Sequence, residues 1–410
     1  MIEQFYTNLL GLPESWMVQN VSQEKENKRV TVQVAYSSAV FACPKCRRDA
    51  SLHDVRKRTV RHLDSCEYET YLEISYPRII CPKCGKQTLI PPFAAASSRF
   101  TNAFENRVIE LCMSATVQKV AKDLKLNWHV IEGIKERAFK RGAARQYRKP
   151  KTKVRHLGID ETSFRKHHNY STIVSDADSG CVLASLDGRD AEMLKNWFAT
   201  QQVADFSSLE SITMDMAPPF IKAVREVFAN ADALICYDRF HVAQLFTRAV
   251  DVIRRKESSF FNRFHQENPL IKTKFEWLRN SGRTDNRARK RRAFMPLTQM
   301  PLKTAKAWKL KEQASKLWDF TYEYVAKKAW NKLLWKLSHS RISELERLAG
   351  SIKEHLRGIL NAIKLKANNA AAEARNSCIQ RVKYMACGYR NKARFNQEIL
   401  FQFGGMDLAL

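Results

Sequence analysis

The chain has no long hydrophobic run. Nowhere in its 410 residues is there a stretch that approaches the ~18 consecutive apolar residues of a membrane span. Residues Met1–Asn20 also lack the basic-then-apolar pattern of a secretion signal. We therefore expect no membrane partner and a location in the cytoplasm.

Acidic residues are in short supply. The chain has 42 Asp and Glu against 70 Lys and Arg, which gives a formal net charge of +28. A surplus of this size is hard to explain by solubility and indicates a polyanionic partner, with nucleic acid first and an anionic membrane surface second. The hydrophobic content of 44% is enough to form buried cores, so wholesale disorder is excluded.

The chain has ten cysteines, but they are spread thinly along 410 residues and no secretion-signal pattern accompanies them, so they do not indicate disulfides. Four of them form two identical Cys-Pro-Lys-Cys turns, and zinc binds well to four thiolates supplied in two such pairs. A redox dithiol is the alternative, but two matched pairs without a thioredoxin-like context disfavour it. The sequence predicts a structural zinc ribbon with four ligands: Cys43, Cys46, Cys81 and Cys84.

A possible helix-turn-helix follows the ribbon. Val117–Leu124 is a short amphipathic helix, Lys125-Leu126 would make the turn, and Asn127 could cap a second helix that runs to about residue 137. An ordinary helical linker is the alternative, but the neighbouring ribbon and the basic composition favour DNA binding. The second helix would present three side chains to base edges and phosphates: His129, Lys135 and Arg137.

Residues 154–238 change to an α/β pattern. Strands are expected at Val154–Asp160, Tyr170–Asp176, Val182–Leu186, Ser211–Asp215 and Ala233–Tyr237, with helices at Ala191–Gln202 and Pro218–Phe228. Three strands followed by alternating helices and strands is the order of a ribonuclease-H-like sheet, although other α/β sheets share parts of it.

A long, very basic helical region then runs from Val242 to about Ala372. Its tryptophans at 277, 308, 318, 330 and 335 are interpreted as packing anchors, since no fixed repeat is present. One basic run inside it supplies candidate DNA contacts: Arg287, Arg289, Lys290, Arg291 and Arg292.

Two aspartates come at the ends of expected strands, Asp160 after Leu157-Gly-Ile and Asp215 after Ser211-Ile-Thr-Met. The first and fourth strands of a ribonuclease-H-like sheet are neighbours, which would place the two carboxylates side by side. Side chains alternate along a strand, so only one of Asp160 and Glu161 can face such a site. Carboxylates that hold two divalent metals about 3.5–4 Å apart can catalyse phosphoryl transfer. For either aspartate alone, a cap or turn role is the alternative.

Five short blocks follow one another along the chain: Leu157–Glu161, Gly188–Asp190, Thr213–Met216, Asp238–Val242 and Ala372–Ser377. In this order they resemble blocks of bacterial insertion-sequence transposases of the IS-L-three group. The paired cysteine turns, the helix-turn-helix, the Gly388–Asn391 block and the Gly404–Leu408 ending are similar too. The resemblance covers about residues 10–408.

The resemblance implies a ribonuclease-H-like core of the Asp-Asp-Glu type. Its catalytic residues, carried over by position, are Asp160, Asp215 and Glu373, which would hold Mg²⁺ or Mn²⁺. Glu373 is chosen by the resemblance, and Ala374 stands where we would expect a glycine. Asp238 and His241 resemble an Asp-x-x-His signature that implies a supporting or DNA-contacting role. A helix N-terminus capped by Asp238, with His241 in its first turn, is the equal alternative.

The implied protein is a DNA transposase that binds double-stranded DNA, both its terminal inverted repeats and its target. It would nick and then join strands without a covalent protein–DNA intermediate. Two DNA ends must be paired, so we expect a homodimer or a higher oligomer, associated with the nucleoid. A transposase-derived DNA-binding regulator would tend to lose one of the three carboxylates. A ribonuclease-H-like structure-selective nuclease would not need end-reading modules.

We therefore expect a multi-domain α/β protein. Its predicted parts are a zinc ribbon (1–95), a helix-turn-helix domain with a basic linker (96–150), the first part of a ribonuclease-H-like mixed sheet (151–245), a basic all-α insertion (246–365) and the C-terminal helices of the catalytic core (366–410).

Overall fold

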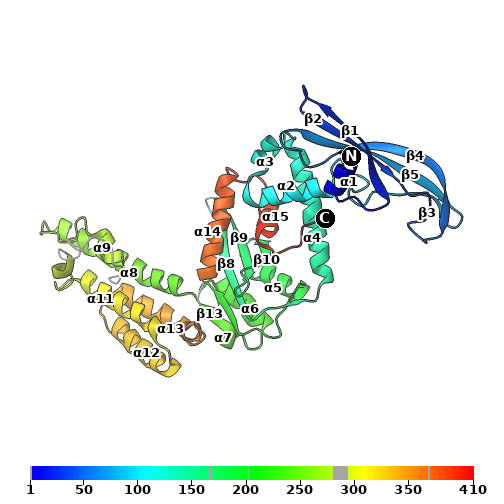
Figure 1. Cartoon of the computed structure of the whole chain (residues 1–410). Coiled ribbons are helices and arrows are strands. Elements are labelled where there is room, and N and C mark those ends of the chain that lie inside the picture. The colour runs from blue at the N-terminus through cyan, green and yellow to red at the C-terminus, as the bar shows by residue number, and fades with distance from the viewer. Residues whose placement is uncertain (1, 166–168, 202, 280–293, 368–369) are drawn as a thin grey trace. The chain divides into compact units, whose positions relative to one another are not determined.

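The computed structural model describes residues 2–165, 169–201, 203–279, 294–367 and 370–410. The chain divides into two compact units, Met1–Gln146 with Met406–Leu410, and Tyr147–Gly405. Figure 1 shows their helices and strands. Among the described helices, none combines the length and the apolar character that crossing a bilayer would demand.

The first unit contains a sheet with the strand order β1-β2-β5-β4-β3, and β6 pairs with β5. Strands β2 and β5 are parallel, and the remaining pairs are antiparallel. Alternating apolar residues of β2 and β5, such as Val32, Val34, Leu72 and Ile74, fill its core against Trp16. The helix and strand bounds are α1 Ile2–Leu9, β1 Trp16–Glu24, β2 Arg29–Tyr36, β3 Phe41–Ala42, β4 Asp49–Arg61, β5 Glu69–Cys81 and β6 Gly85–Thr88.

Three helices follow in the same unit: α2 Asn102–Ser114, α3 Val117–Asp123 and α4 Trp128–Arg148. Thr116 caps α3 by accepting a hydrogen bond from the Lys119 amide. Asn127 accepts one from the amide of His129 at 2.9 Å, as its predicted capping role requires. Helix α4 continues to residue 148, beyond the end near residue 137 that the sequence predicts for the second helix.

The second unit is built on a sheet with the order β10-β9-β8-β12-β13. Strands β8, β9 and β10 are antiparallel, whereas β12 and β13 run parallel to β8. This is the ribonuclease-H-like topology that the order of elements predicts. The strands are β8 His156–Arg165, β9 Asn169–Asp176, β10 Val182–Asp187, β12 Ser211–Met214 and β13 Ile235–Tyr237, and a separate parallel pair joins β7 Thr152–Lys153 to β11 Ala204–Asp205.

Helices cover both faces of this sheet. On one face, Val174 and Ala184 belong to a core that includes residues of α5 and α6. On the other, Ile173 and Val182 pack with Ile379 of α14 and with residues of α15. The helices are α5 Ala191–Thr200, α6 Pro218–Val227, α7 Ala231–Leu234, α14 Ala370–Met385 and α15 Lys392–Phe403.

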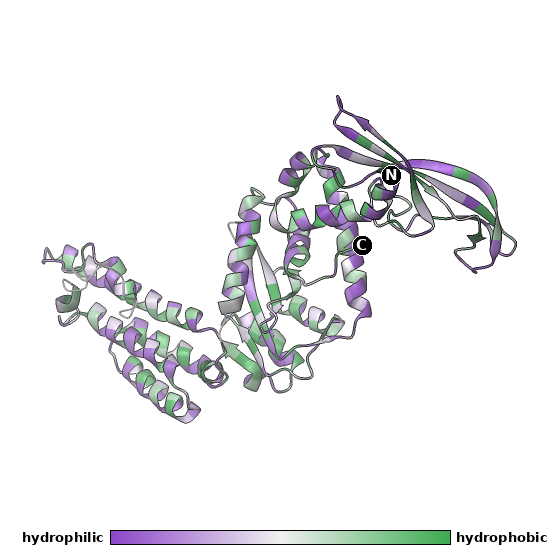
Figure 2. Ribbon diagram, in the orientation of Figure 1, coloured by the Kyte–Doolittle hydropathy of each residue, from purple (hydrophilic) through white to green (hydrophobic). Residues whose placement is uncertain are grey.

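The helical insertion leaves the sheet after β13 and returns before α14. Figure 2 shows hydrophobic and hydrophilic residues alternating along its helices, as amphipathic packing requires. Trp277 and Trp330 are fully buried anchors, but Trp335 is 62% exposed, which corrects its predicted packing role. The predicted basic run from Arg287 to Arg292 lies outside the described residues. The helices are α8 Arg239–Arg263, α9 Lys274–Leu278, α11 Lys303–Lys316, η1 Leu317–Asp319, α12 Glu323–Ser338 and α13 Ser343–Lys364.

Candidate metal centres and DNA-binding modules

Two aspartates from neighbouring strands stand side by side. The parallel register pairs Met214 of β12 with Ile159 of β8, so Asp215, directly after β12, lies next to Asp160. The prediction that Asp160 ends its strand is wrong. Strand β8 continues to Arg165 because β9 pairs with it over that length. The site therefore lies where β12 ends against the middle of β8.

His241, in the first turn of α8, joins the two aspartates. Its Nε2 lies 2.7 Å from Oδ1 of Asp215 and 3.8 Å from Oδ2 of Asp238. One ligand atom each from Asp160, Asp215 and His241 lie within 4.8 Å of one another. Asp238 meanwhile caps α8, since its Oδ1 accepts a hydrogen bond from the Phe240 amide at 3.2 Å. Asp238 therefore caps the helix, and the same first turn brings His241 beside the carboxylates, so both alternatives that the sequence offered for this segment are present.

The electrostatics of this cluster are those of carboxylates held close together. Burial raises the pKa of Asp160 to about 6, and the nearby Asp215 carboxylate acts in the same direction. The contact with Asp215 raises the pKa of His241. Within the described residues, Oδ1 of Asp215 is buried and accepts no well-aligned hydrogen bond, although Nε2 of His241 lies 2.7 Å from it.

This donor set suits a divalent cation. Carboxylate oxygens are the ligands that Mg²⁺ and Mn²⁺ prefer, and an imidazole nitrogen is more readily accepted by Mn²⁺. The buried oxygen of Asp215 without an aligned donor is the atom for which a cation would be the natural partner.

Glu373 lies in the first turn of α14, and its side chain is exposed. Its carboxylate is not among the ligand atoms that gather around Asp160 and Asp215. One turn further along α14, however, Asn376 donates a hydrogen bond from Nδ2 to Oδ2 of Asp160 at 2.7 Å. Asn376 is not among the site residues that the sequence predicts, although it follows Glu373 by three residues in the same block and so lies on the same side of the helix.

Glu161 lies outside the cluster, as the alternation of a strand predicts. Its carboxylate is 3.6 Å from a guanidinium nitrogen of Arg189, and burial raises its pKa. Asp190, which follows Arg189 in the chain, caps α5 by accepting a hydrogen bond from the Met193 amide at 2.8 Å. The Gly-Arg-Asp block therefore connects the neighbourhood of the site to the start of α5.

The four predicted zinc ligands converge in the first unit. The sulfur atoms of Cys43, Cys46, Cys81 and Cys84 lie within 4.8 Å of one another. Burial by itself would raise the pKa of the Cys43 thiol. Hydrogen bonds from the amides of residues 46 and 45 outweigh it and lower that pKa to about 7, which favours the thiolate that zinc requires. The two histidines between the cysteine turns, His53 and His62, could replace a thiolate ligand but are not part of this group.

The two Cys-Pro-Lys-Cys turns end in the same backbone conformation. The residue after each second cysteine has a left-handed backbone conformation, with φ of 60° at Arg47 and 69° at Gly85. In the first turn, the amide of Arg47 donates to the carbonyl of Cys43 at 2.8 Å. Four thiols brought together by two such turns fit a tetrahedral zinc ion.

The helix-turn-helix residues do not all face outward. His129 is exposed. Lys135 is only 6% exposed because it shares the buried face of α4 with Ile131 and Ala138, so the prediction that it faces DNA is wrong. Arg137 is half exposed, and its guanidinium pairs with the buried carboxylate of Glu105 at 2.6 Å.

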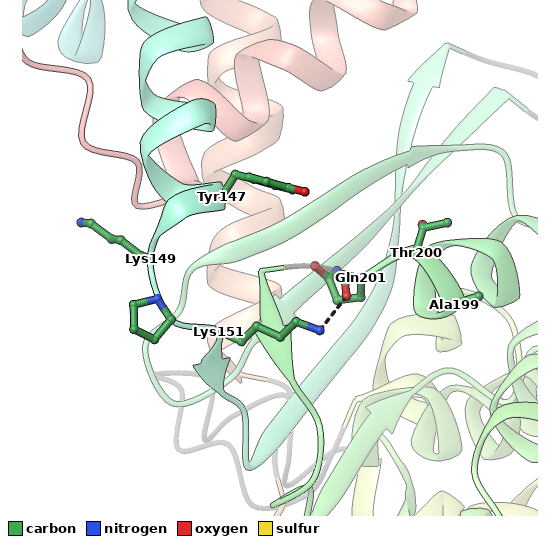
Figure 3. Close-up of a pocket in the computed structure, with 7 residues that line it drawn as sticks. Tyr147, Lys149, Lys151, Ala199, Thr200 and Gln201 are labelled. Carbon is green, nitrogen blue, oxygen red and sulfur yellow. Dashed lines mark hydrogen bonds between the residues drawn. The ribbon is translucent and has the colours of Figure 1, made fainter.

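A separate pocket of about 560 Å³ lies between the end of α5 and the segment that follows α4 (Figure 3). Lys151 spans it by donating to the carbonyl of Gln201 at 3.1 Å. None of the described residues that line this pocket carries a carboxylate, and none belongs to the acidic cluster. Its lining residues are Tyr147, Lys149, Pro150, Lys151, Ala199, Thr200 and Gln201.

A ribonuclease-H-like sheet with paired carboxylates, preceded by a zinc ribbon and a helix-turn-helix, defines a protein of the DNA-processing class. Residues 157–399 match the ISL3 family model described as "Transposase". Residues 39–84 match the "zinc-finger of transposase IS204/IS1001/IS1096/IS1165", and residues 90–138 match the "Helix-turn-helix domain of transposase family ISL3". The chain belongs to the ISL3 family of insertion-sequence transposases, the IS-L-three group that its sequence blocks resemble.

Two curated relatives agree with this assignment. Over 413 residues, 99% of each chain, the protein is 26% identical to the transposase for insertion sequence element IS1001 of Bordetella parapertussis. It is also 30% identical to the transposase for insertion sequence element IS1557 of Mycobacterium tuberculosis over 260 residues. This match covers 62% of this chain and 58% of the relative. Membership of this family implies an enzyme that cuts and transfers DNA, and the helix-turn-helix implies DNA binding.

Proposed function

We propose that this transposase binds the terminal inverted repeats of its insertion sequence and catalyses metal-dependent strand cleavage followed by strand transfer. The observation that carries the proposal is the convergence of Asp160, Asp215 and His241 at the point where β12 ends against β8. Paired carboxylates in a ribonuclease-H-like sheet are suited to phosphoryl transfer.

Asp160 and Asp215 would hold Mg²⁺ or Mn²⁺ through their carboxylate oxygens. Divalent ions there would supply an activated water or DNA 3′-hydroxyl for in-line attack and would stabilise the leaving 3′-oxygen. We assign Glu373 as the third carboxylate on the family resemblance, and the hydrogen bond from Asn376 to Asp160, which keeps the first turns of α14 against β8, supports this assignment. No side chain acts as the nucleophile, so no serine or tyrosine is required.

His241 and Asp238 are positioning residues in this proposal. Asp238 caps α8 and so fixes the first turn, which carries the imidazole. A protonated His241 balances the charge of Asp215 before a cation binds, and its raised pKa follows from that contact. Binding of the cation would then compete with the proton, and the neutral imidazole could serve as a nitrogen ligand.

The N-terminal unit would locate the DNA ends. We assign a structural zinc ion to Cys43, Cys46, Cys81 and Cys84, where it would hold β5 and β6 to the segment between β3 and β4. We assign His129, which is exposed at the start of α4, as a contact to the repeat. Pairing two ends requires a homodimer or a higher oligomer on the DNA.

A supercoiled plasmid that carries the element's terminal repeats, incubated with Mg²⁺, tests the proposal. We expect nicks at the repeat ends, and we expect Asp160→Asn to abolish them. Asp178→Asn is the matched control, since Asp178 lies between β9 and β10 with a 54% exposed side chain outside the cluster; it should nick normally. Cleavage that survives Asp160→Asn would refute the metal assignment. Binding of the ends without any cleavage would support a DNA-binding regulator. Cutting of branched DNA without end preference would support a structure-selective nuclease.

A further inference from the structure

Helix α12 leaves an aromatic face uncovered. Tyr324 is 76% exposed and Trp335 is 62% exposed. They lie about three helical turns apart on the same side, at a separation of ~16 Å along the axis. The opposite side of the helix is well packed, with Trp330 and Leu337 fully buried. The exposed rings are therefore a surface feature of a helix whose core side is complete.

Trp335 is held in place. The ring of His339 stacks against the indole with centroids 4.6 Å apart and planes 23° from parallel. The imidazole Nδ1 also lies 2.9 Å from the carbonyl oxygen of Trp335, one turn earlier. An indole fixed on one side and exposed over most of its surface loses little freedom when a further planar group stacks on it.

Lysines surround the two rings. Lys327, Lys328 and Lys332 are exposed, and within the described parts of the chain none of them has an ion-pair partner. The acidic residue of the helix, Glu323, is already paired with Lys364 at 3.2 Å. The face therefore combines uncompensated positive charge with flat apolar surface.

We propose that this face of α12, defined by Tyr324, Lys328, Lys332 and Trp335, binds unpaired nucleotides of the DNA substrate. Bases stack on the two rings, and the lysines contact the phosphates between them. A blunt duplex buries the faces of its bases and presents only their edges and backbone, so it cannot use the rings in this way. The inference rests on the proposed action on DNA and adds a site for single strands to it.

Self-association through this face is disfavoured by charge. A two-fold contact between two copies would place the same patch on both sides, so Lys328 and Lys332 would approach their own counterparts. Like charges in contact oppose such an interface. A polyanion with planar bases complements both properties of the face.

Binding of the full-length protein to a labelled single-stranded oligothymidylate and to a labelled blunt duplex of equal length tests the proposal. We expect Trp335→Ala and Tyr324→Ala each to weaken binding of the single strand by about tenfold or more, with little change for the duplex. Lys328→Ala combined with Lys332→Ala should reduce the salt dependence of single-strand binding. Phe275→Ala is the matched control, since Phe275 is 64% exposed on α9 of the same insertion; it should change neither affinity.

Equal binding of the single strand by Trp335→Ala and the parent protein would overturn the proposal. So would an equal loss for both DNAs, or a shift from dimer to monomer in Trp335→Ala with unchanged DNA affinity. The result is separable from the nicking experiment. A protein that never nicks repeat ends but loses single-strand binding on Trp335→Ala supports this site alone. If the protein nicks repeat ends, and Trp335→Ala binds the single strand as tightly as the parent protein does, only the proposed single-strand site is refuted.

Discussion

Asn376 of α14 donates a hydrogen bond to the Asp160 carboxylate of β8 at 2.7 Å. Two further side chains continue the contact along the same side of the helix. Gln380 donates to the hydroxyl of Thr162 at 2.7 Å, and Lys383 donates to the carbonyl of residue 163, also at 2.7 Å. These donors, spaced four and then three residues apart, fix the register of α14 against β8. Glu373, one turn before Asn376, is positioned by the same register.

Removing the Asn376 amide should impair the metal site more than the fold. We expect Asn376→Ala to reduce plasmid nicking at least about tenfold, because a misplaced ligand is costly to catalysis, and to weaken Mn²⁺ binding measured by calorimetry. Gln380→Ala is the control, since it removes a hydrogen bond of the same helix without touching Asp160. Each substitution should cost only about 1 kcal/mol of unfolding free energy. Equal nicking and equal Mn²⁺ affinity in the two variants would show that Asn376 serves only to dock the helix.

The Asp160 carboxyl predicts a pH dependence of stability. Its pKa is raised from 3.8 to about 6 in the folded protein, so folding favours its protonated form. The stabilising contribution is complete below pH ~4 and is lost as the pH rises through ~6. Without divalent cations, Asp160→Asn should therefore be more stable than the parent at pH 7, by up to about 3 kcal/mol, and not at pH 4. Urea denaturation at both pH values measures this, and the reverse order would contradict it.

Mg²⁺-dependent nicking should also fall as the pH drops below ~6, since a proton on Asp160 competes with the cation. Raising the Mg²⁺ concentration should partly restore the rate at low pH. A rate limited by some other group would not respond in this way.

Much of the catalytic sheet could be predicted because its strands are short apolar runs with a distinctive order. That order, interpreted as a ribonuclease-H-like sheet, predicted Asp160 and Asp215 on neighbouring strands, and the register of β8 with β12 confirms it. The strand end at Asp160 could not be predicted correctly, because the continuation of β8 depends on pairing with β9 rather than on its own residues. The resemblance implied a supporting or DNA-contacting role for His241, but its contact with Asp215 and that of Asn376 with Asp160 depend on how α8 and α14 pack against the sheet.

Local patterns were less reliable for surface lysines and aromatics. The charge of Lys135 favoured a DNA contact, but Lys135 lies on the same face of α4 as Ile131 and Ala138 and is buried with them. Trp335 looked like a core residue by its type, yet it lies across α12 from the buried Trp330. In both cases, the position on the helix decides exposure more than the residue type does.

Removing zinc should unfold the ribbon. We expect Cys43→Ser to lose bound zinc, to lower the melting temperature of the protein and to abolish binding of the terminal repeats, because a zinc ribbon depends on its metal for folding. Cys66→Ser is the control, since Cys66 is exposed and outside the ligand group. Zinc content by elemental analysis, together with repeat binding, checks the prediction. A Cys43→Ser protein that keeps its zinc would contradict it.

The two cysteine turns should respond in opposite ways to substitution after their second cysteine. Arg47→Gly should stabilise the ribbon by about 1 kcal/mol, because glycine adopts a φ of 60° without strain. Gly85→Ala should destabilise it by a similar amount, since the surrounding space is open and only the backbone conformation is affected. Thermal denaturation of the zinc-loaded protein measures both. Equal effects of the same sign would refute the backbone explanation.

Helix α13 approaches β13 closely at one glycine. A Cβ at Gly358 would lie 2.5 Å from the ring of Tyr237 and 3.3 Å from the carbonyl of Ile235. We expect Gly358→Ala to destabilise the protein by about 1–3 kcal/mol through overpacking. Gly350→Ala, in the same helix with nothing within 4 Å, should instead stabilise it by about 1 kcal/mol. Urea denaturation of the two variants measures the difference, and two variants of equal stability would argue against the close contact.

Helix α8 runs unbroken for 25 residues, a rod of ~37 Å. Its first turn carries His241, and its remainder is packed into the insertion that also bears the α12 face. One continuous helix backbone therefore joins the imidazole beside Asp215 to the part of the chain that bears the α12 face, and the close contact of Gly358 with Tyr237 holds that part against the sheet.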